Sequence, residues 1–292
     1  MAYRKNKSHF AAELVGTESR DWGCSTGVVL VLAFALVPIQ ASAAEDERKW
    51  NLDLGIGVAF VPDYAGSRTA SPRLRIWADG GYQTDDFGKL ALDSGSLTLP
   101  PEARWDFVDS RDVGVGLLVG YRTGRNDVNP PFTSATDGSS RLRGLPIVGG
   151  SVDAGLAGYL VAFGVPFFAQ WRSAVEGSQG ALVILGAYIP LKPAPDLEFS
   201  ILPTVTWANA RQMQTFFGVS PTAADASGFA PYQVAGGWEN ASIEAVADWH
   251  VAGGWHLTAS AAYQRILGAA ARSPIVLTPR QPSVLAGIVF SF

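Results

Sequence analysis

WHLTASAAYQ, residues 255–264, alternates along its whole length between two kinds of side chain. One face of an extended strand would carry Trp255, Leu257, Ala259, Ala261 and Tyr263, and the other His256, Thr258, Ser260, Ala262 and Gln264. The same split between an apolar and a more polar face recurs in residues 51–60, 112–121, 197–207 and 241–251. The pattern predicts a set of two-faced β-strands.

The composition agrees with an all-β domain. Of the 292 residues, 48% are hydrophobic and only 16% are charged, and the 32 glycines and 18 prolines favour many short strands joined by turns. After residue 43, no run of 18 apolar residues is available for a membrane-spanning helix. The net charge of -4 argues against a nucleic-acid partner, which would require a basic surface.

A soluble β-sandwich would also alternate, but three features favour a transmembrane antiparallel β-barrel of the outer-membrane type, in contact with lipid. Short turns alternate with long polar loops. The chain ends in SVLAGIVFSF, whose last aromatics, Phe290 and Phe292, resemble the assembly signal of such barrels. Aromatic residues stand at strand ends on the apolar face, as in the girdles of membrane barrels: Tyr121, Trp207, Trp249, Trp255 and Tyr263.

Loop parity predicts about twelve strands, with ten as the alternative. Long connections at 62–71, 124–148, 176–180, 209–238 and 266–281 would all lie at one end of the barrel. This arrangement requires two strands between about residues 81 and 99. Residues 44–292 then form one barrel domain with long extracellular loops and short periplasmic turns.

Residues 1–43 have the pattern of a cleaved signal peptide. Basic residues precede the 13-residue apolar run GVVLVLAFALVPI (27–39), and Ala41-Ser42-Ala43 forms a cleavage site. We expect the chain to be exported and inserted in an outer membrane. The only cysteine, Cys24, precedes the apolar run, so the exported chain would have no thiol for disulfides or catalysis.

The longest loop carries the apolar segment RQMQTFFGVSP, residues 211–221. An exposed cluster of Met213, Phe216 and Phe217 would reduce solubility. We therefore predict that these three side chains anchor the loop inside the barrel mouth. An exposed ligand or partner site is the functional alternative.

Charges of both signs are expected on the lumenal face of the strands. In a narrow barrel such side chains can pair with one another and fill the bore, so a plugged lumen is favoured over a pore. A small-solute channel with a wetter interior is the alternative. The predicted lumenal charges are Asp53, Arg73, Arg75, Asp112, Arg172, Glu198, Glu244 and Asp248.

Catalysis has little support in the sequence. His250 and His256 flank a short turn near Asp248 and Glu244, which brings an acid close to a histidine, but no Gly-x-Ser-x-Gly motif is present. Lumenal hydrogen bonding explains this group more simply. Two histidines across a hairpin are also too little for a metal site, so we predict no enzyme activity, no metal and no cofactor.

RQMQTFFGVSP, the following SGFAPY and WHLTASAAYQRILGAAARSPIV closely resemble the C-terminal half of the MipA/OmpV family, and VPDYAGS (61–67) and LRGLPIVGGSVDAG (142–155) are similar to its other segments. The resemblance implies a barrel in the outer membrane of a Gram-negative cell that acts as a scaffold for a lytic transglycosylase and a penicillin-binding protein. We expect docking on the periplasmic turns and on the acidic residues Glu45, Asp46 and Glu47.

Overall fold

A computed structural model describes residues 49–84 and 87–292 of the chain. The expected signal peptide and the acidic residues Glu45, Asp46 and Glu47 lie outside the described residues. The first strand of the described residues begins at Trp50.

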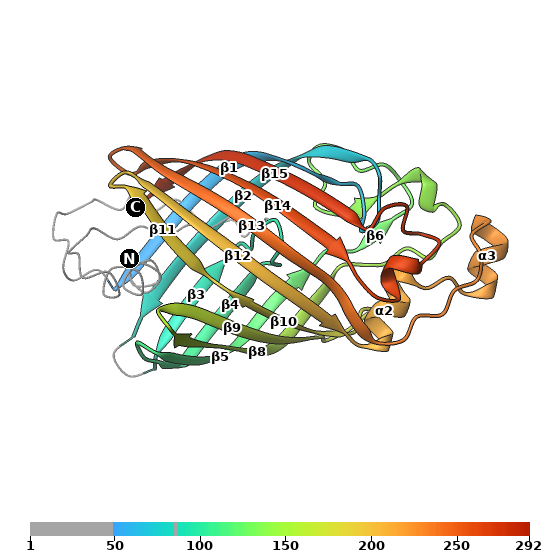
Figure 1. Ribbon diagram of the computed structural model, residues 1–292, viewed down its shortest axis with the longest axis horizontal. Helices are drawn as coiled ribbons and strands as arrows, with labels where there is room; N and C mark the ends of the chain where they lie inside the picture. Colours follow the sequence, from blue (N-terminus) through green and yellow to red (C-terminus); the bar gives the residue numbers. More distant parts are fainter. Residues whose placement is uncertain (1–48, 85–86) are drawn as a thin grey trace.

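One antiparallel sheet closes on itself, because the first strand pairs with the last (Figure 1). Its strands are β1 (Trp50–Pro62), β2 (Ala70–Gln83), β3 (Lys89–Asp93), β4 (Glu102–Asp109), β5 (Val113–Arg122), β8 (Ser151–Ala162), β9 (Val165–Ala174), β10 (Ala181–Ala187), β11 (Ile189–Ala194), β12 (Leu197–Ala208), β13 (Gly237–Ala252), β14 (Trp255–Ile266) and β15 (Arg280–Ser291). Consecutive β10 and β11 both pair with β12 and act as one strand. The described residues therefore form a closed barrel of twelve strands, which confirms the predicted fold class and the higher of the two counts.

The third and fourth strands lie later in the chain than the sequence suggested. Two strands were expected between about residues 81 and 99, but only β3 lies there, and β4 occupies Glu102–Asp109. Residues 94–101 leave the barrel wall and turn into its interior (Figure 1). Pro100 and Pro101, which have no backbone N–H to donate to a neighbouring strand, delay the start of β4. We call residues 94–101 the lumenal segment.

The two ends of the barrel differ. One end holds the start of β1 at Trp50, the C-terminal Phe292 and the tight β4–β5, β8–β9, β11–β12 and β13–β14 turns, and we call it the short-turn rim (Figure 1). The other, the loop rim, carries α2 (Ala210–Phe217), α3 (Pro221–Ser227), the 3-10 helices η1 (Ser140–Leu142) and η2 (Ala270–Arg272), and the strand pair β6 (Arg125–Asn126) and β7 (Asp137–Gly138). None of the helices in the described part of the chain is long and apolar enough to cross a membrane.

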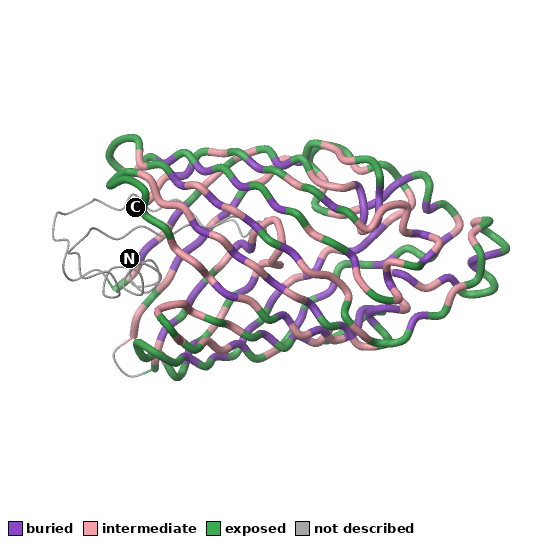
Figure 2. The backbone as a smooth tube through the Cα atoms, viewed as in Figure 1, coloured by how far each residue is buried: buried purple, intermediate pink, exposed green. Residues whose placement is uncertain are grey.

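Exposure alternates along the strands as the sequence predicts (Figure 2). In β14, Trp255 is 52% exposed and its neighbour His256 only 1%. The exposed face is apolar on all sides of the barrel, from Ile56 on β1 through Leu156 on β8 to Ile288 on β15. Closing the sheet removes its free end strands, and the apolar outer surface suits a lipid environment.

This facing makes a direct prediction for Ala259, an exposed residue midway between Trp255 and Tyr263 on β14. Ala259→Arg should cost about 2–4 kcal/mol of stability because it places a cation in the middle of the apolar belt. Ala252→Arg, at the exposed end of β13 beside the turn, should cost no more than about 1 kcal/mol. Guanidinium unfolding of protein folded into phosphatidylcholine vesicles measures both. Equal losses would mean that Ala259 does not face lipid.

Candidate functional site

The predicted lumenal charges occupy different surroundings in the structure. Buried positions hold Asp53, Arg73, Arg172, Glu244 and Asp248, whereas Arg75 and Glu198 are partly buried. Asp112 is exposed in the β4–β5 turn, so the prediction that it faces the lumen is wrong. The reason is local: β5 starts only at Val113, and the alternation of a strand does not extend into the turn before it.

One buried ion pair joins the barrel wall to the loop rim. Arg122 on β5 donates two hydrogen bonds to Asp153 on β8, from Nε at 2.6 Å and from Nη2 at 2.8 Å. Its Nη1 donates to Oε1 of Gln212 on α2 at 2.9 Å, and that oxygen also accepts a bond from the Gly180 backbone N–H at 3.1 Å. The arrangement fixes α2 on the wall.

Sequence reasoning missed this group, although a signal was present. Arg122 continues the alternating pattern of residues 112–121 by one position, on the inward face. Asp153 lies on the inward face of β8. The alternation therefore indicates that both side chains face inward, but it does not predict that they pair.

A second buried pair holds the end of the lumenal segment. Arg172 on β9 is 0% exposed and pairs with Glu102 on β4. Its guanidinium also donates to the backbone carbonyls of Pro100 and Pro101, each at 3.4 Å. Arginine has five donors, so one side chain can hold a carboxylate and two carbonyls together.

The middle of the lumenal segment wraps around Glu244 of β13, which is 0% exposed. The Glu244 carboxylate accepts hydrogen bonds from Ser96 Oγ at 2.7 Å and from Thr98 Oγ1 at 2.9 Å. It also accepts bonds from the backbone N–H groups of Leu97 at 3.3 Å and Thr98 at 3.2 Å. The donors satisfy a carboxylate that would otherwise be costly to bury.

The lumenal segment is also fixed on a third part of the wall. Arg75 on β2 donates from Nη2 to the Ser96 carbonyl at 3.2 Å, and Asp79 accepts a bond from the Ser94 backbone N–H at 2.6 Å. Since β2, β9 and β13 are distinct parts of the wall, the segment crosses the bore. The segment and the charged side chains that bind it therefore lie inside the bore at this level.

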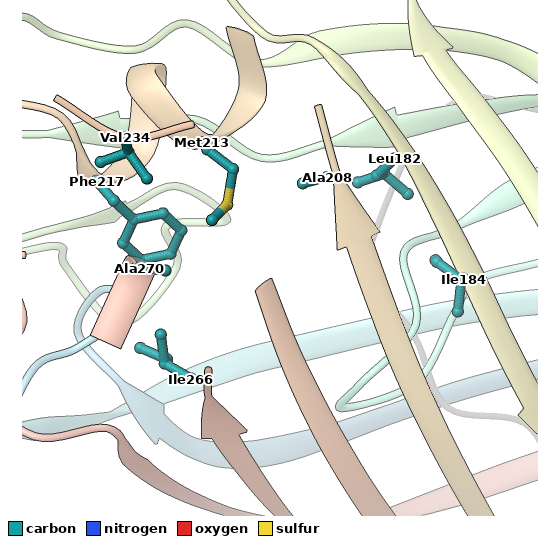
Figure 3. Close-up of a cluster of buried hydrophobic side chains, with 8 residues drawn as sticks. All are labelled: Leu182, Ile184, Ala208, Met213, Phe217, Val234, Ile266 and Ala270. Carbon is teal, nitrogen blue, oxygen red and sulfur yellow. The ribbon is translucent and has the colours of Figure 1, made fainter. Parts of the chain in front are cut away.

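The apolar loop segment lies at the barrel mouth. Asn209 caps α2 by accepting a bond from the Gln212 backbone N–H, and Gly218 ends the helix. Met213 and Phe217 are buried, and Phe216 packs at the side of the same cluster. Figure 3 shows the buried members of this cluster: Leu182, Ile184, Ala208, Met213, Phe217, Val234, Ile266 and Ala270.

The histidines near the short-turn rim make ordinary hydrogen bonds. His256 Nδ1 lies 2.7 Å from Asp248 Oδ1, and His250 Nε2 lies 2.8 Å from the Gly253 carbonyl oxygen. The two rings are 5.2 Å apart between centroids. Within residues 49–84 and 87–292, no three His, Cys, Asp or Glu side chains gather as a possible metal site.

The remaining predicted residues lie close to the short-turn rim. Glu198 pairs with Lys192 at 2.7 Å. On the last strand and at the chain end, the rings of Phe290 and Phe292 pack edge to face with centroids 4.8 Å apart, and Phe290 also contacts Trp255. The aromatic end of the chain is therefore part of one cluster on the outer surface.

Comparisons with known proteins identify relatives of this barrel. A family model described as MltA-interacting protein MipA matches residues 54–292, which confirms the resemblance found in the sequence. A comparison with curated proteins found no match.

Solved structures with a similar fold include the NanC porin, with 12% identity and a TM-score of 0.42 over 82% of this chain and 98% of that one. OmpT of Vibrio cholerae has 9% identity and a TM-score of 0.36 over 83% and 96% of the two chains. OprD of Pseudomonas aeruginosa has 13% identity and a TM-score of 0.36 over 85% and 66%.

Proposed function

Because the chain belongs to the MltA-interacting protein MipA family, we propose that it is an outer-membrane barrel that holds peptidoglycan enzymes together in the periplasm. The proposed partners are a lytic transglycosylase, as the family description suggests, and a penicillin-binding protein. In this proposal residues 1–43 are the signal peptide, the short-turn rim faces the periplasm, and the protein has no enzyme activity of its own.

The lumenal segment is the observation that favours a scaffold over a small-solute channel. Glu244 and Arg172 hold residues 94–101 across the bore through buried, charge-assisted hydrogen bonds. A buried charge that loses its partner costs free energy. Displacing residues 94–101 from Glu244 and Arg172 would therefore be unfavourable. A barrel filled in this way is better suited to binding at its ends than to transport.

The short-turn rim offers a docking surface of mixed character. Residues 191–196 form a continuous exposed run that includes Lys192 and Asp196. Phe163 stands at the tip of the β8–β9 turn, is fully exposed, and has a positive φ of 55°. The acidic residues Glu45, Asp46 and Glu47, which precede β1 in the sequence, are proposed to complete the contact. The shallow surface suggests modest affinity.

The backbone at Phe163 strengthens the case for a functional aromatic. Phe163 and Gly164 both have positive φ, a conformation in which two-residue turns prefer Asn-Gly. A phenylalanine there is strained by about 1–2 kcal/mol. An exposed aromatic that lowers stability fits a binding anchor. Aromatic side chains that become buried when a partner binds often dominate the affinity of protein interfaces.

Phe163→Asn should therefore separate stability from binding. We expect unfolding stability to stay the same or rise by about 1 kcal/mol as the strain is relieved. Capture of a purified lytic transglycosylase should weaken about tenfold or more, measured by surface plasmon resonance with the barrel in nanodiscs. Ile147→Asn, an equally drastic change at an exposed position on the loop rim, should leave capture unchanged.

Two outcomes would contradict the proposal. The first is that Phe163→Asn and the Glu45→Lys, Asp46→Lys, Glu47→Lys triple variant both capture the lytic transglycosylase as well as the wild type does. This result would exclude the short-turn rim as the docking surface. Absence of any peptidoglycan enzyme after crosslinking and affinity capture, together with steady ion conduction in planar bilayers, would replace the scaffold with the channel.

A further inference from the structure

The barrel wall is incomplete beside β2. In the described part of the chain, β3 pairs with β2 only along Gly80–Gln83, because the lumenal segment leaves the wall after Asp93. The remainder of β2 toward the loop rim, from Ala70 to Trp77, lies outside this ladder, whereas the backbone of Ala78 is bonded by the Ser94 hydroxyl. This stretch lies level with Ile56 and Val58, in the apolar belt of β1. Open sheet edges do not occur in hydrocarbon, so something must cover it.

Part of the long β5–β8 connection covers the gap. We call residues 130–137 the strap. The Phe132 carbonyl accepts a hydrogen bond from the Leu74 backbone N–H at 2.8 Å, taking the place of a strand partner. Arg73 Nη1 donates to the Pro130 carbonyl at 3.3 Å, and the Gly138 backbone N–H donates to the Asp63 carbonyl at 2.7 Å. These bonds replace only part of a strand ladder.

A cavity of about 260 Å³ lies between β2 and the strap. Its β2 side has two chemical characters: Arg73 and Arg75 come from the inward face, and Leu74 and Ile76 come from the face that is apolar elsewhere on the barrel. Ser134 and Asp137 of the strap line the other side. The cavity therefore combines a cationic wall with an apolar one at the depth of the lipid belt.

The arginines have donors to spare. Arg73 is 4% exposed, and its Nη2 makes no hydrogen bond among the described residues; it forms only a long ion pair with Asp63 Oδ1 at 3.9 Å. Arg75 Nε also has no hydrogen-bond partner within that part of the chain. Buried guanidinium donors without acceptors are costly, and phosphate or carboxylate oxygens match their geometry.

The nearby acid is a weak counter-charge. Asp63 already accepts hydrogen bonds from Thr69 and Ser71, so its charge is shared.

We propose that this cavity binds a single-chain anionic amphiphile, whose phosphate or carboxylate head lies on Arg73 and Arg75 and whose alkyl chain lies against Leu74 and Ile76. The inference is independent of the scaffold role, because it concerns the wall beside β2 and not the short-turn rim. A head group and a chain are both required: the arginines select the charge and the apolar wall selects the chain.

Hexyl phosphate is a suitable probe because it is soluble and carries both parts. Isothermal titration calorimetry of the full barrel in phosphatidylcholine nanodiscs should show saturable binding at one site. Inorganic phosphate, which has no chain, and hexanol, which has no charge, should each bind at least about tenfold more weakly. Empty nanodiscs correct for partition of the probe into lipid.

Variants locate the binding. Arg73→Gln and Arg75→Gln should each weaken hexyl phosphate binding about tenfold or more, whereas Arg68→Gln, on an exposed neighbouring loop, should not. Val61→Trp fills the cavity from β1 without altering a charge and should abolish binding. Val58→Trp, on the exposed face of the same strand, is its matched control. Heat-modifiable migration on gels shows whether each variant folds.

Three results would overturn the proposal. Wild-type protein that shows no saturable binding of hexyl phosphate has no such site. Equal affinity for inorganic phosphate would mean a simple anion site in which the alkyl chain plays no part. Unchanged binding in folded Val61→Trp would place the ligand elsewhere on the barrel.

Discussion

Asp153→Ala is expected to destabilise the barrel by about 3–5 kcal/mol, because it leaves the Arg122 guanidinium buried without its carboxylate. Asp153 is 0% exposed and accepts two of the hydrogen bonds of Arg122. The remaining partners, Gln212 and the Gly180 carbonyl, are neutral. Equilibrium unfolding in vesicles, followed by tryptophan fluorescence, measures the loss.

Two further variants distinguish a buried unpaired charge from a general loss of packing. The Arg122→Met, Asp153→Leu double variant removes both charges and should recover most of the stability. Lys192→Met breaks the Lys192–Glu198 pair, which is much more exposed, and should cost no more than about 1 kcal/mol. A double variant as unstable as Asp153→Ala would show that the ion pair is not the cause.

Glu244→Gln is expected to loosen the lumenal segment and to open the barrel to ions. The substitution keeps the size of the side chain but removes the charge that accepts bonds from Ser96 and Thr98. Hydrogen bonds to a charged group contribute about 1.5–3 kcal/mol each, so the variant should lose stability by that order. Planar bilayer recordings should change from a quiet baseline to steady current.

Two further variants test whether the lumenal segment is the barrier to ions. Glu176→Gln removes a carboxylate from an exposed loop and should leave the current at baseline. Deletion of residues 95–99 removes the obstruction itself and should give the largest conductance. A deletion variant that folds and still conducts nothing would show that the lumenal segment is not the barrier, whereas conduction by the unmodified protein would favour the channel.

The sequence by itself determined the class of fold. Alternation such as that of residues 255–264 depends only on the two-residue period of a strand, so each outward face could be identified without knowing any neighbour. Loop parity gave the preference for twelve strands, and the terminal aromatics marked the last strand. The motifs around residues 211–221 were specific enough to indicate the family.

Only the tertiary structure decided which side chains hold the lumenal segment inside the barrel. Alternation places Arg172 and Glu244 on inward faces, but it does not say that one holds Pro100 and Pro101 and the other Ser96 and Thr98. For Asp112 the alternation predicted the wrong environment, because the pattern was extended one residue beyond the start of β5.

The strap illustrates the same limit. Phe132 and Leu74 are far apart in the chain, and neither has a local signal that would pair them. Their contact arises because the chain leaves the wall at Ser94 and because the lipid belt does not tolerate the open edge of β2. The face of a residue is a property of its own strand, whereas its partner depends on how all twelve strands close around it.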